Sequence, residues 1–243
     1  MSPLFRKLLR DLQRMHGQVL AIAVVIAGGV ATLVMSQTSL ESLTTTRDMF
    51  YRDSRFSEVF VTLRRAPSYL EEQIQAIPVV QFVETRIRAT ANLEIPGYPD
   101  PAMGLFLSLP DGANAELNRL YLRTGRLPGY GQDREAVVGE AFADAHGFDP
   151  GDRLTAIING RRQELTIVGL ALSQEFIYLL KPGELFPDLK RHGVFWMNRA
   201  ALAAANDMDG AFNDAVLSLA REGSGTCWSI WTAFWLPTAA WVR

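Results

Sequence analysis

The fold of this chain is decided first by one apolar run, Val19-Leu-Ala-Ile-Ala-Val-Val-Ile-Ala-Gly-Gly-Val-Ala-Thr-Leu-Val-Met35. The stretch from Gly17 to Leu40 contains no charged residue. Because about 20 apolar residues in a helix cross the roughly 30 Å hydrocarbon layer of a bilayer, we expect a transmembrane helix over residues 17–37. A cleaved signal peptide and a buried helix are the alternatives. The signal peptide is disfavoured, since its apolar region is usually only about 7–15 residues long and no clear cleavage site follows this run.

The residues that flank this run predict its orientation in the membrane. Residues 1–16 carry four cations and one acid, whereas acids and bases are mixed between Gln37 and Asp53. The positive-inside rule therefore places the N-terminus in the cytoplasm and everything after Ser36 outside it. Phe5 and several leucines alternate with the cations at helical spacing, so we expect residues 1–16 to form a basic amphipathic stub on the inner membrane surface. The four cations are Arg6, Lys7, Arg10 and Arg14.

Small residues follow one face of the apolar run. Ala23, Ala27 and Ala31 recur every four residues, and Gly28 lies beside them. Small side chains allow a second transmembrane helix to approach closely, so we predict a helix-packing face at these four positions. The alternative is that they reflect the ordinary composition of membrane helices.

Composition and charge exclude several classes of protein. Hydrophobic residues make up 48% of the chain and charged residues 21%, so long disordered tails are not expected. The net charge of −2 argues against nucleic-acid binding through bulk positive charge. A single cysteine, Cys227, excludes a disulfide framework within the chain and a zinc site built from cysteines.

Motifs that carry catalytic or cofactor chemistry are absent from the sequence. It contains no P-loop, G-x-S-x-G, H-E-x-x-H or G-x-G-x-x-G motif. The stretch Asp207-Met-Asp209-Gly210 opens like a calcium loop, but its glycine is fourth rather than sixth, so a turn that ends a helix is expected. Glu175 and Tyr178 lie in an apolar patch, where we expect a half-exposed strand and a paired polar site is the alternative. We predict no catalytic, cofactor-binding or metal-binding residue and do not expect an enzyme.

The residues after the apolar run alternate between short strand and helix patterns, which predicts an α+β domain. Residues 57–64 alternate apolar and polar side chains as a strand does. Residues 67–77 have helical spacing, with a proline near the start and Pro78 after the end. Together with the β-rich stretch 79–95 and a strand over 103–109, they resemble a split β-α-β unit.

A second block is expected to begin near Leu120 and to form another lobe. Its Asn159-Gly160 pair favours a type I′ turn, so the apolar stretches on both sides predict a β-hairpin. The expected strands are 135–139, 154–158, 164–172, 176–180, 194–197 and 212–219, and the expected helices are 140–146 and 198–206. The prediction is therefore a single N-terminal transmembrane helix followed by a two-lobed extracytoplasmic α+β domain over residues 38–222.

Four stretches of this domain carry a resemblance to a known family: Leu122-Arg-Thr-Gly-Arg-Leu-Pro128, Glu135-Ala-Val-Val-Gly-Glu-Ala-Phe-Ala143, Gly147-Phe-Asp-Pro-Gly-Asp152 and Leu165-Thr-Ile-Val-Gly169. They look like the MacB-like periplasmic core domain of FtsX-type ABC transporter permeases. In that family a G-R-x-P loop precedes a V-V-(G/N)-E-x-(F/L)-A strand and helix, and a P-G-D turn, a hairpin and an I-V-G strand follow. The resemblance covers roughly residues 5–219, and its motifs are structural rather than catalytic.

The resemblance implies a place and a function for the chain. Permeases of this family lie in the bacterial inner membrane with the main domain in the periplasm, and they carry no ATPase of their own. The implied partners are a separate ABC ATPase subunit, a second permease copy or homologue, and the lipid bilayer, with no nucleic acid. The implied function is transmembrane transport or export, or mechanical transmission to the envelope, driven by that ATPase. A membrane-anchored binding or sensory module without an ATPase partner is the alternative.

The last residues depart from the family pattern. Four of the five tryptophans lie in residues 223–243, and no second hydrophobic span follows the domain. One interpretation is an aromatic segment at the membrane interface. Another is a frameshift, since the adjacent reading frame after Thr226 can spell VLVDLDRLLAPYGGLGA, an ordinary amphipathic continuation. On that interpretation the chain is the N-terminal portion of a longer permease and is not transport-competent alone. The four tryptophans are Trp228, Trp231, Trp235 and Trp241.

Overall fold

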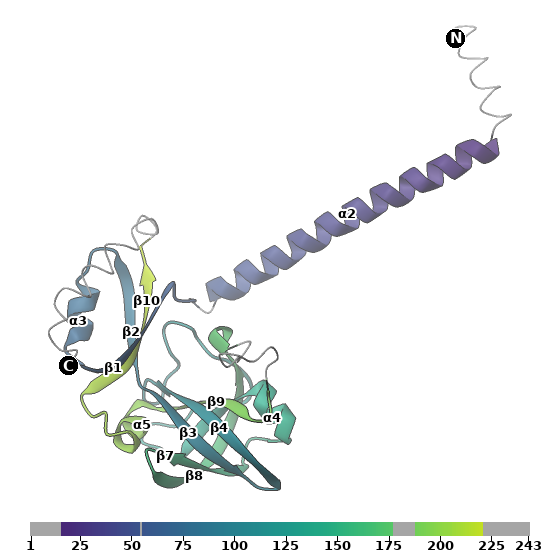
Figure 1. The fold of residues 1–243 in the computed structure, drawn as a ribbon. Coiled ribbons are helices and arrows are strands. Elements are labelled where there is room, and N and C mark those ends of the chain that lie inside the picture. Colours follow the sequence, from purple (N-terminus) through teal and green to yellow (C-terminus); the bar gives the residue numbers. More distant parts are fainter. Residues whose placement is uncertain (1–15, 54, 177–187, 221–243) are drawn as a thin grey trace. The chain divides into compact units, whose positions relative to one another are not determined.

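The computed structural model describes residues 16–53, 55–176 and 188–220 (Figure 1). The chain divides after Asp53 into two compact units. The basic stub over residues 1–15, the side chain of Tyr178 and the tryptophan-rich segment from residue 223 lie outside the described residues, so the expectations for them stay predictions.

The first unit contains one long helix, α2 (His16–Asp53). Within it, Leu20–Leu43 has a mean hydropathy of 2.0 and is not buried by any other part of the chain. Of the described helices it alone is long and apolar enough to cross a membrane. The predicted apolar helix is therefore confirmed as a helix, and it continues without a break through the polar residues that follow.

The small lobe of the second unit is a three-stranded sheet. It comprises β1 (Val59–Pro67), β2 (Val80–Arg86) and β10 (Ala211–Leu219), with α3 (Leu70–Gln75) connecting β1 to β2. The strand order is β1-β10-β2, and β10 is antiparallel to both neighbours, so β1 and β2 are parallel. This is the predicted split β-α-β unit, and the strand that splits it comes from the far end of the domain (Figure 1).

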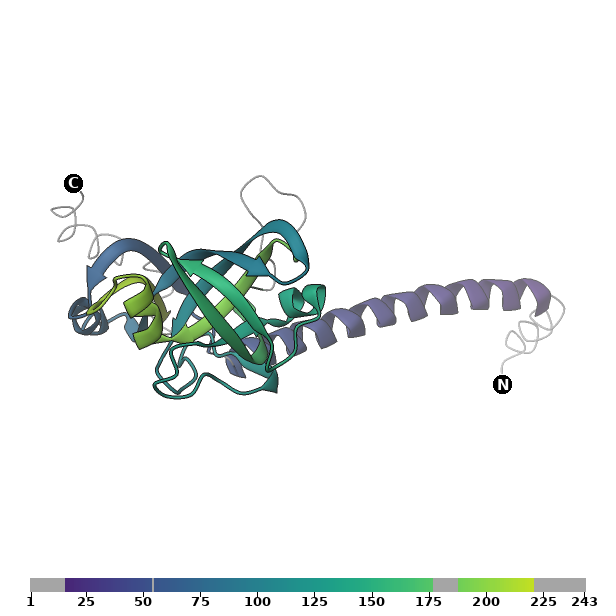
Figure 2. The ribbon, with the colours of Figure 1, turned by 90° about the horizontal axis from the view of Figure 1, so that it is seen from below.

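The barrel lobe is a seven-stranded mixed sheet that closes on itself. Its order is β5-β8-β6-β9-β4-β3-β7, and β7 also pairs with β8, which closes a six-stranded barrel with β5 attached outside it. The long strand β8 makes this closure by pairing with β7 through its first half and with β6 through its second half. Figure 2 shows the strong twist of these strands. The strands are β3 (Arg88–Ile95), β4 (Tyr98–Leu109), β5 (Tyr121–Gly125), β6 (Glu135–Gly139), β7 (Arg153–Ile158), β8 (Arg161–Leu172) and β9 (His192–Asn198), and the short helices are α4 (Glu140–His146), η1 (Gln174–Phe176) and α5 (Arg199–Ala205).

The α+β fold class is confirmed, and one expectation within it is wrong. The second lobe does not begin near Leu120, because β3 and β4 already belong to the barrel. This boundary lies inside the β-rich stretch 79–95, where only Ile87 separates β2 of the small lobe from β3 of the barrel lobe. Of the strand expected over 176–180 only Phe176 is described, and it ends the 3₁₀ turn η1. Residues 177–180 lie outside the described residues, so the expectation for them stays a prediction.

The predicted hairpin is confirmed by its turn. Asn159 and Gly160 both have positive φ, 48° and 75°, as a type I′ turn requires. The turn joins β7 to β8 in a regular antiparallel ladder, with Ile158 opposite Arg161.

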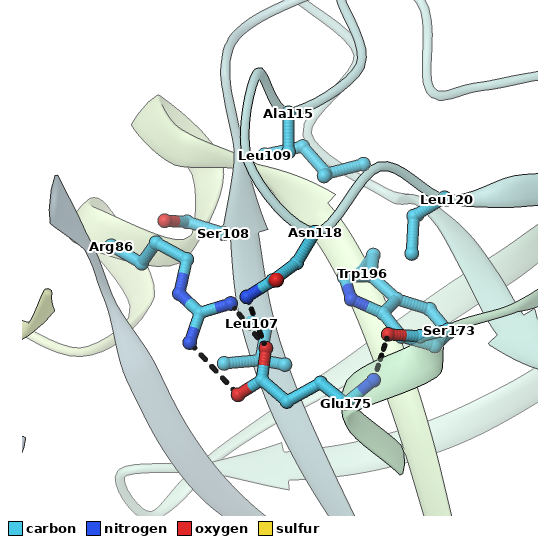
Figure 3. Close-up of a pocket in the computed structure, with 10 residues that line it drawn as sticks. All are labelled: Arg86, Leu107, Ser108, Leu109, Ala115, Asn118, Leu120, Ser173, Glu175 and Trp196. Atoms are coloured by element: carbon cyan, nitrogen blue, oxygen red, sulfur yellow. Dashed lines mark hydrogen bonds and ion pairs between the residues drawn. The ribbon is translucent and has the colours of Figure 1, made fainter. Parts of the chain in front are cut away.

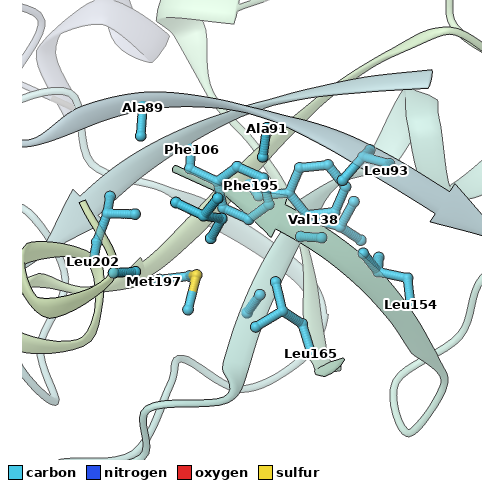
Figure 4. Close-up of a cluster of buried hydrophobic side chains, with 14 of the residues drawn as sticks. Ala89, Ala91, Leu93, Phe106, Val138, Leu154, Leu165, Phe195, Met197 and Leu202 are labelled. Atoms are coloured by element: carbon cyan, nitrogen blue, oxygen red, sulfur yellow. The ribbon is translucent and has the colours of Figure 1, made fainter. Parts of the chain in front are cut away.

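Aromatic packing fills the inside of the barrel. Phe106 and Phe195 stack with ring centroids 4.9 Å apart, and Phe142 of α4 meets Phe195 edge-on at 5.5 Å. All three are at most 2% exposed, and aliphatic residues such as Leu154 and Leu165 surround them (Figure 4). This close-packed core holds β4, β9 and α4 together.

Two glycines of the stretches that resemble the family lie opposite each other where β5 pairs with β8. Gly125 pairs with Gly169, and Gly125 has a φ of 79°. A Cβ atom at Gly169 would lie 2.5 Å from the carbonyl oxygen of Arg126, and backbone atoms cannot move aside as a flexible side chain would. The close approach lets the N–H of Arg126 donate to the carbonyl of Val168.

We predict that Gly169→Ala lowers the free energy of unfolding by about 1–3 kcal/mol, because the added methyl overlaps a fixed carbonyl oxygen. The matched control is Gly139→Ala, since Gly139 has a φ of −64° and its Cβ would be 3.6 Å from the nearest atom. The measurement is urea unfolding of the detergent-solubilised chain followed by near-ultraviolet circular dichroism. Equal stability of the two variants would contradict the close-approach argument.

Candidate functional site at the junction of the two lobes

The predicted helix-packing residues lie on the surface of α2. Ala23, Ala27, Gly28 and Ala31 are all exposed, and a Cβ at Gly28 would meet no atom within 4 Å. The hydroxyl of Thr32 donates to the carbonyl of Gly28 at 2.9 Å, so it is satisfied within the helix. Nothing among the described residues covers this face, and its packing against a second helix stays a prediction.

The acidic stretch after α5 is a turn, as predicted. Asp207 has a φ of 53°, and its carboxylate accepts hydrogen bonds from Arg161 at 3.0 Å and from Asn159 at 2.8 Å. These bonds occupy the carboxylate and tie the turn to the β7–β8 hairpin. Within residues 16–53, 55–176 and 188–220, no group of three or more His, Cys, Asp or Glu side chains could hold a metal ion.

The densest polar cluster of the described domain lies where the lobes meet (Figure 3). Arg86, at the end of β2, donates from both terminal nitrogens to the carboxylate of Glu175 on η1, at 2.7 and 2.9 Å. Its Nε donates to Asp214 of β10 at 2.8 Å. The side chains of Arg86, Glu175 and Asp214 are only 7, 11 and 3% exposed. A buried guanidinium therefore joins two strands of the small lobe to a turn of the barrel lobe.

Charge compensation keeps the buried guanidinium of Arg86 ionised. Desolvation alone would lower the pKa of Arg86, but its hydrogen bonds and charge interactions with Glu175 and Asp214 outweigh burial and raise that pKa above its ordinary value. A buried charge without such partners would cost several kcal/mol, roughly, in desolvation. The three side chains are thus one interdependent unit.

Asn118 extends the cluster to the residues that follow α2 in the chain. Its Nδ2 donates to Glu175 at 3.2 Å, and its Oδ1 accepts the backbone N–H of Ser57 at 2.9 Å. Its own N–H donates to the carbonyl of Arg55 at 3.1 Å. Asn118 has a positive φ of 51°, which asparagine tolerates better than most residues. The beginning of the domain is thereby fixed to the same junction.

The cavity beside the cluster is too small for a ligand of ordinary size. It measures about 10 Å³ and is lined by Arg86, Asn118, Ser173, Glu175 and Trp196, among others (Figure 3). That volume is near the minimum for one water molecule, whereas small-molecule sites usually occupy about 300–1,000 Å³. The geometry therefore indicates a structural junction rather than a substrate pocket.

The two residues before Arg86 in β2 also bond to the barrel lobe. Glu84 accepts the backbone N–H groups of Glu116 and Leu117 through the same oxygen, at 3.0 and 2.8 Å. Burial raises the pKa of Glu84, although these two hydrogen bonds oppose the shift. On the opposite face of the strand, Arg199 of α5 donates to the carbonyl of Thr85. The end of β2 is consequently held from both faces by polar contacts.

Sequence reasoning singled out Glu175 but missed its partners. Arg86 and Asp214 each lie in a strand pattern, where a charged residue ordinarily points to solvent. Arg86 is 89 residues from Glu175 and 128 residues from Asp214 in the chain, so no local spacing reports the contact. We expected Glu175 on a half-exposed strand, but it lies on the 3₁₀ turn η1, and its side chain is only 11% exposed and bound to Arg86. The alternative, a paired site with Tyr178, stays a prediction because Tyr178 lies outside the described residues.

The two ends of the domain lie side by side. Val59 at the start of β1 pairs with Leu217 near the end of β10. The N–H of Leu219 donates to the side chain of Glu58 at 2.8 Å, and the N–H of Ala220 donates to the carbonyl of Val79 at 2.9 Å. The chain therefore enters and leaves the domain at one end of the small sheet.

Comparison with known proteins gives likenesses of fold. Neither a family model nor a curated protein matches the chain. The extracellular domain of the noncanonic ABC-type transporter YknZ from Gram-positive bacteria is 9% identical, with 69% of this chain and 86% of that chain covered and a TM-score of 0.45. The periplasmic region of MacB from Actinobacillus actinomycetemcomitans is 10% identical, with 74% and 82% covered and a TM-score of 0.44.

We predict that Arg86→Met lowers the free energy of unfolding by about 3–5 kcal/mol, because it leaves Glu175 without its counter-charge and Asp214 with only Arg88, 4.0 Å away. The control is Arg123→Met, since the Arg123 side chain is 52% exposed in its pair with Glu140 and its loss should cost at most about 1 kcal/mol. Urea unfolding of both variants measures the difference. A loss for Arg86→Met as small as that of the control would show that the cluster does not hold the junction.

A second prediction concerns pH. Because the pKa of Glu84 is raised in the folded chain above 4.5, the native state binds more protons than the unfolded state just above that value, and stability falls as the pH rises through the folded pKa. Glu84→Gln retains one oxygen for both N–H groups and removes this titration. The free energy of unfolding of the variant minus that of the wild type should therefore be larger at about pH 8 than at about pH 4. Urea unfolding at both pH values measures this gain, and a constant difference would contradict it.

Proposed function

We propose that this chain is the N-terminal portion of an FtsX-type ABC transporter permease, with residues 38–222 as its periplasmic core domain. The observation that carries the proposal is the adjacency of Val59 and Leu217, since a domain whose ends meet at one point can be inserted between two membrane helices. The stretches that resemble the family also have structural roles in the fold. Gly125 and Gly169 allow the backbones of β5 and β8 to approach closely. Arg126, which follows β5, pairs with Glu135 at the start of β6.

In this proposal the domain responds to membrane helices that an ABC ATPase moves from the cytoplasmic side. β1 follows α2 in the sequence, and the start of β1 pairs with the end of β10, so in this proposal force on either strand acts on one small sheet. β10 carries Asp214 and β2 carries Arg86, through which the small sheet holds the barrel lobe. One transmembrane helix cannot line a transport pathway, so this portion alone does not transport. The ATPase and a second permease copy are the proposed partners, and the bacterial inner membrane is the proposed location.

The proposed orientation predicts which cysteines an impermeant reagent reaches. In a Cys227→Ser background, Tyr130→Cys places a thiol at a side chain that is 83% exposed in the barrel lobe. A membrane-impermeant maleimide should label it in intact spheroplasts. It should label Ser2→Cys, the matched site in the cytoplasmic stub, only after permeabilisation. The opposite pattern would overturn the orientation.

The proposal also predicts the gene beyond the Thr226 codon. Resequencing several hundred bases should reveal an adjacent frame that reads VLVDLDRLLAPYGGLGA and then encodes further hydrophobic spans. A gene for an ABC ATPase should lie nearby. If no frame encodes further spans and no ATPase gene accompanies it, the anchored binding or sensory module becomes the better account.

A further inference from the structure

The contacts between the two lobes differ in kind from the contacts within them. Each lobe has an apolar core of its own, built around Phe212 in the small lobe and around Phe106 and Phe195 in the barrel. The side-chain bonds that cross between the lobes are polar, and those of Arg86 and Glu84 come from the end of β2. Polar contacts of this kind have several arrangements of similar energy, whereas close-packed apolar cores do not.

The covalent crossings between the lobes are short. One is Ile87, the single residue between β2 and β3. The other is the turn after α5, where Asp207 and Gly210 both have positive φ before β10 begins. A lobe that hangs on two short connections can change its orientation by adjusting a few backbone angles at those points.

Within the cluster, one carboxylate partner of Arg86 lies in the same lobe and the other lies in the barrel lobe. Asp214 lies on the strand that pairs directly with β2, with Asp214 opposite Arg86 in the ladder, so this bond is internal to the small lobe. Glu175 lies across the junction on η1, a single 3₁₀ turn. The adjacent cavity of about 10 Å³ is large enough for one water, which could hydrate the guanidinium where Glu175 leaves it.

We propose that the Arg86–Glu175 ion pair is an interlobe latch. When it is closed, it fixes the orientation of the barrel lobe on the small sheet. When it opens, Arg86 keeps Asp214 and stays in the small lobe. The barrel lobe, with Ile87 still packed in its core and bonded to Ser108, then turns at the link between Arg86 and Ile87 and at the 207–210 turn. The proposal concerns the domain itself and does not depend on the transport function.

The test is the distance between the lobes. In the full chain with Cys227→Ser, spin labels at Tyr69→Cys and Tyr130→Cys report on the small and barrel lobes, since these side chains are 63 and 83% exposed. Pulsed electron–electron double resonance should give one narrow distribution of distances between the two labels when the latch is closed. Glu175→Gln should broaden this distribution at least roughly two-fold, because a neutral amide holds the guanidinium weakly. The control is Glu164→Gln, which removes a solvent-exposed ion pair with Arg153 between two strands of the barrel lobe and should leave the distribution unchanged.

Hydrogen exchange separates a latch from a purely structural ion pair. In Glu175→Gln, the amide of Leu117, which crosses the junction to Glu84, should exchange roughly ten-fold faster, while the ladder amides of β9 and β10 keep their protection. Glu175→Asp, which retains the charge with a shorter reach, should give a smaller change in the same direction. An unchanged distance distribution would overturn the latch. Loss of protection within the ladders of either lobe would also overturn it, because the pair would then support a lobe rather than join two.

Discussion

Arg86 ends β2 with its guanidinium between two carboxylates that belong to different lobes. Each partner is almost fully buried, so none can lose its counter-charge without a large desolvation cost. The same strand end holds Glu84 and Thr85, which bond to the barrel lobe on opposite faces. The position of the barrel on the small sheet therefore depends on a few charge-assisted hydrogen bonds, together with the packing of Ile87 and Ala211 in the barrel core.

The topology explains why this junction matters for a membrane-anchored protein. β10 lies between β1 and β2, so the chain leaves the domain beside the point where it enters. β10 runs between that end of the small sheet and Asp214, which bonds to Arg86. In the proposed function a displacement of the small sheet acts through this strand on the barrel, which has a close-packed interior of its own.

Much of the local structure could be predicted from the sequence, because it depends on neighbours in the chain. The apolar run gave a continuous helix, Asn159-Gly160 gave its hairpin turn, and the helix α4 begins and ends where its pattern indicated. The two glycines Gly125 and Gly169 could be recognised as a motif, but their reason, a backbone approach between β5 and β8, is visible only in three dimensions. Barrel closure through β8 and the lobe boundary at Ile87 were missed because both depend on pairings between strands far apart in the chain. The ion-pair cluster was missed for the same reason, since Arg86 and Asp214 look like ordinary surface residues of alternating strands.

The most direct test of this account is a double-mutant cycle on Arg86 and Glu175, with Arg86→Leu, Glu175→Leu and the double variant compared by urea unfolding. The contribution of Asp214 is common to both variants that lack Arg86, so it cancels in the cycle. We expect a coupling energy above about 1 kcal/mol, because the pair is bidentate and buried. Effects of the two substitutions that add within about 0.3–0.5 kcal/mol would show that the two residues act independently, and the lobe junction would then rest on other contacts.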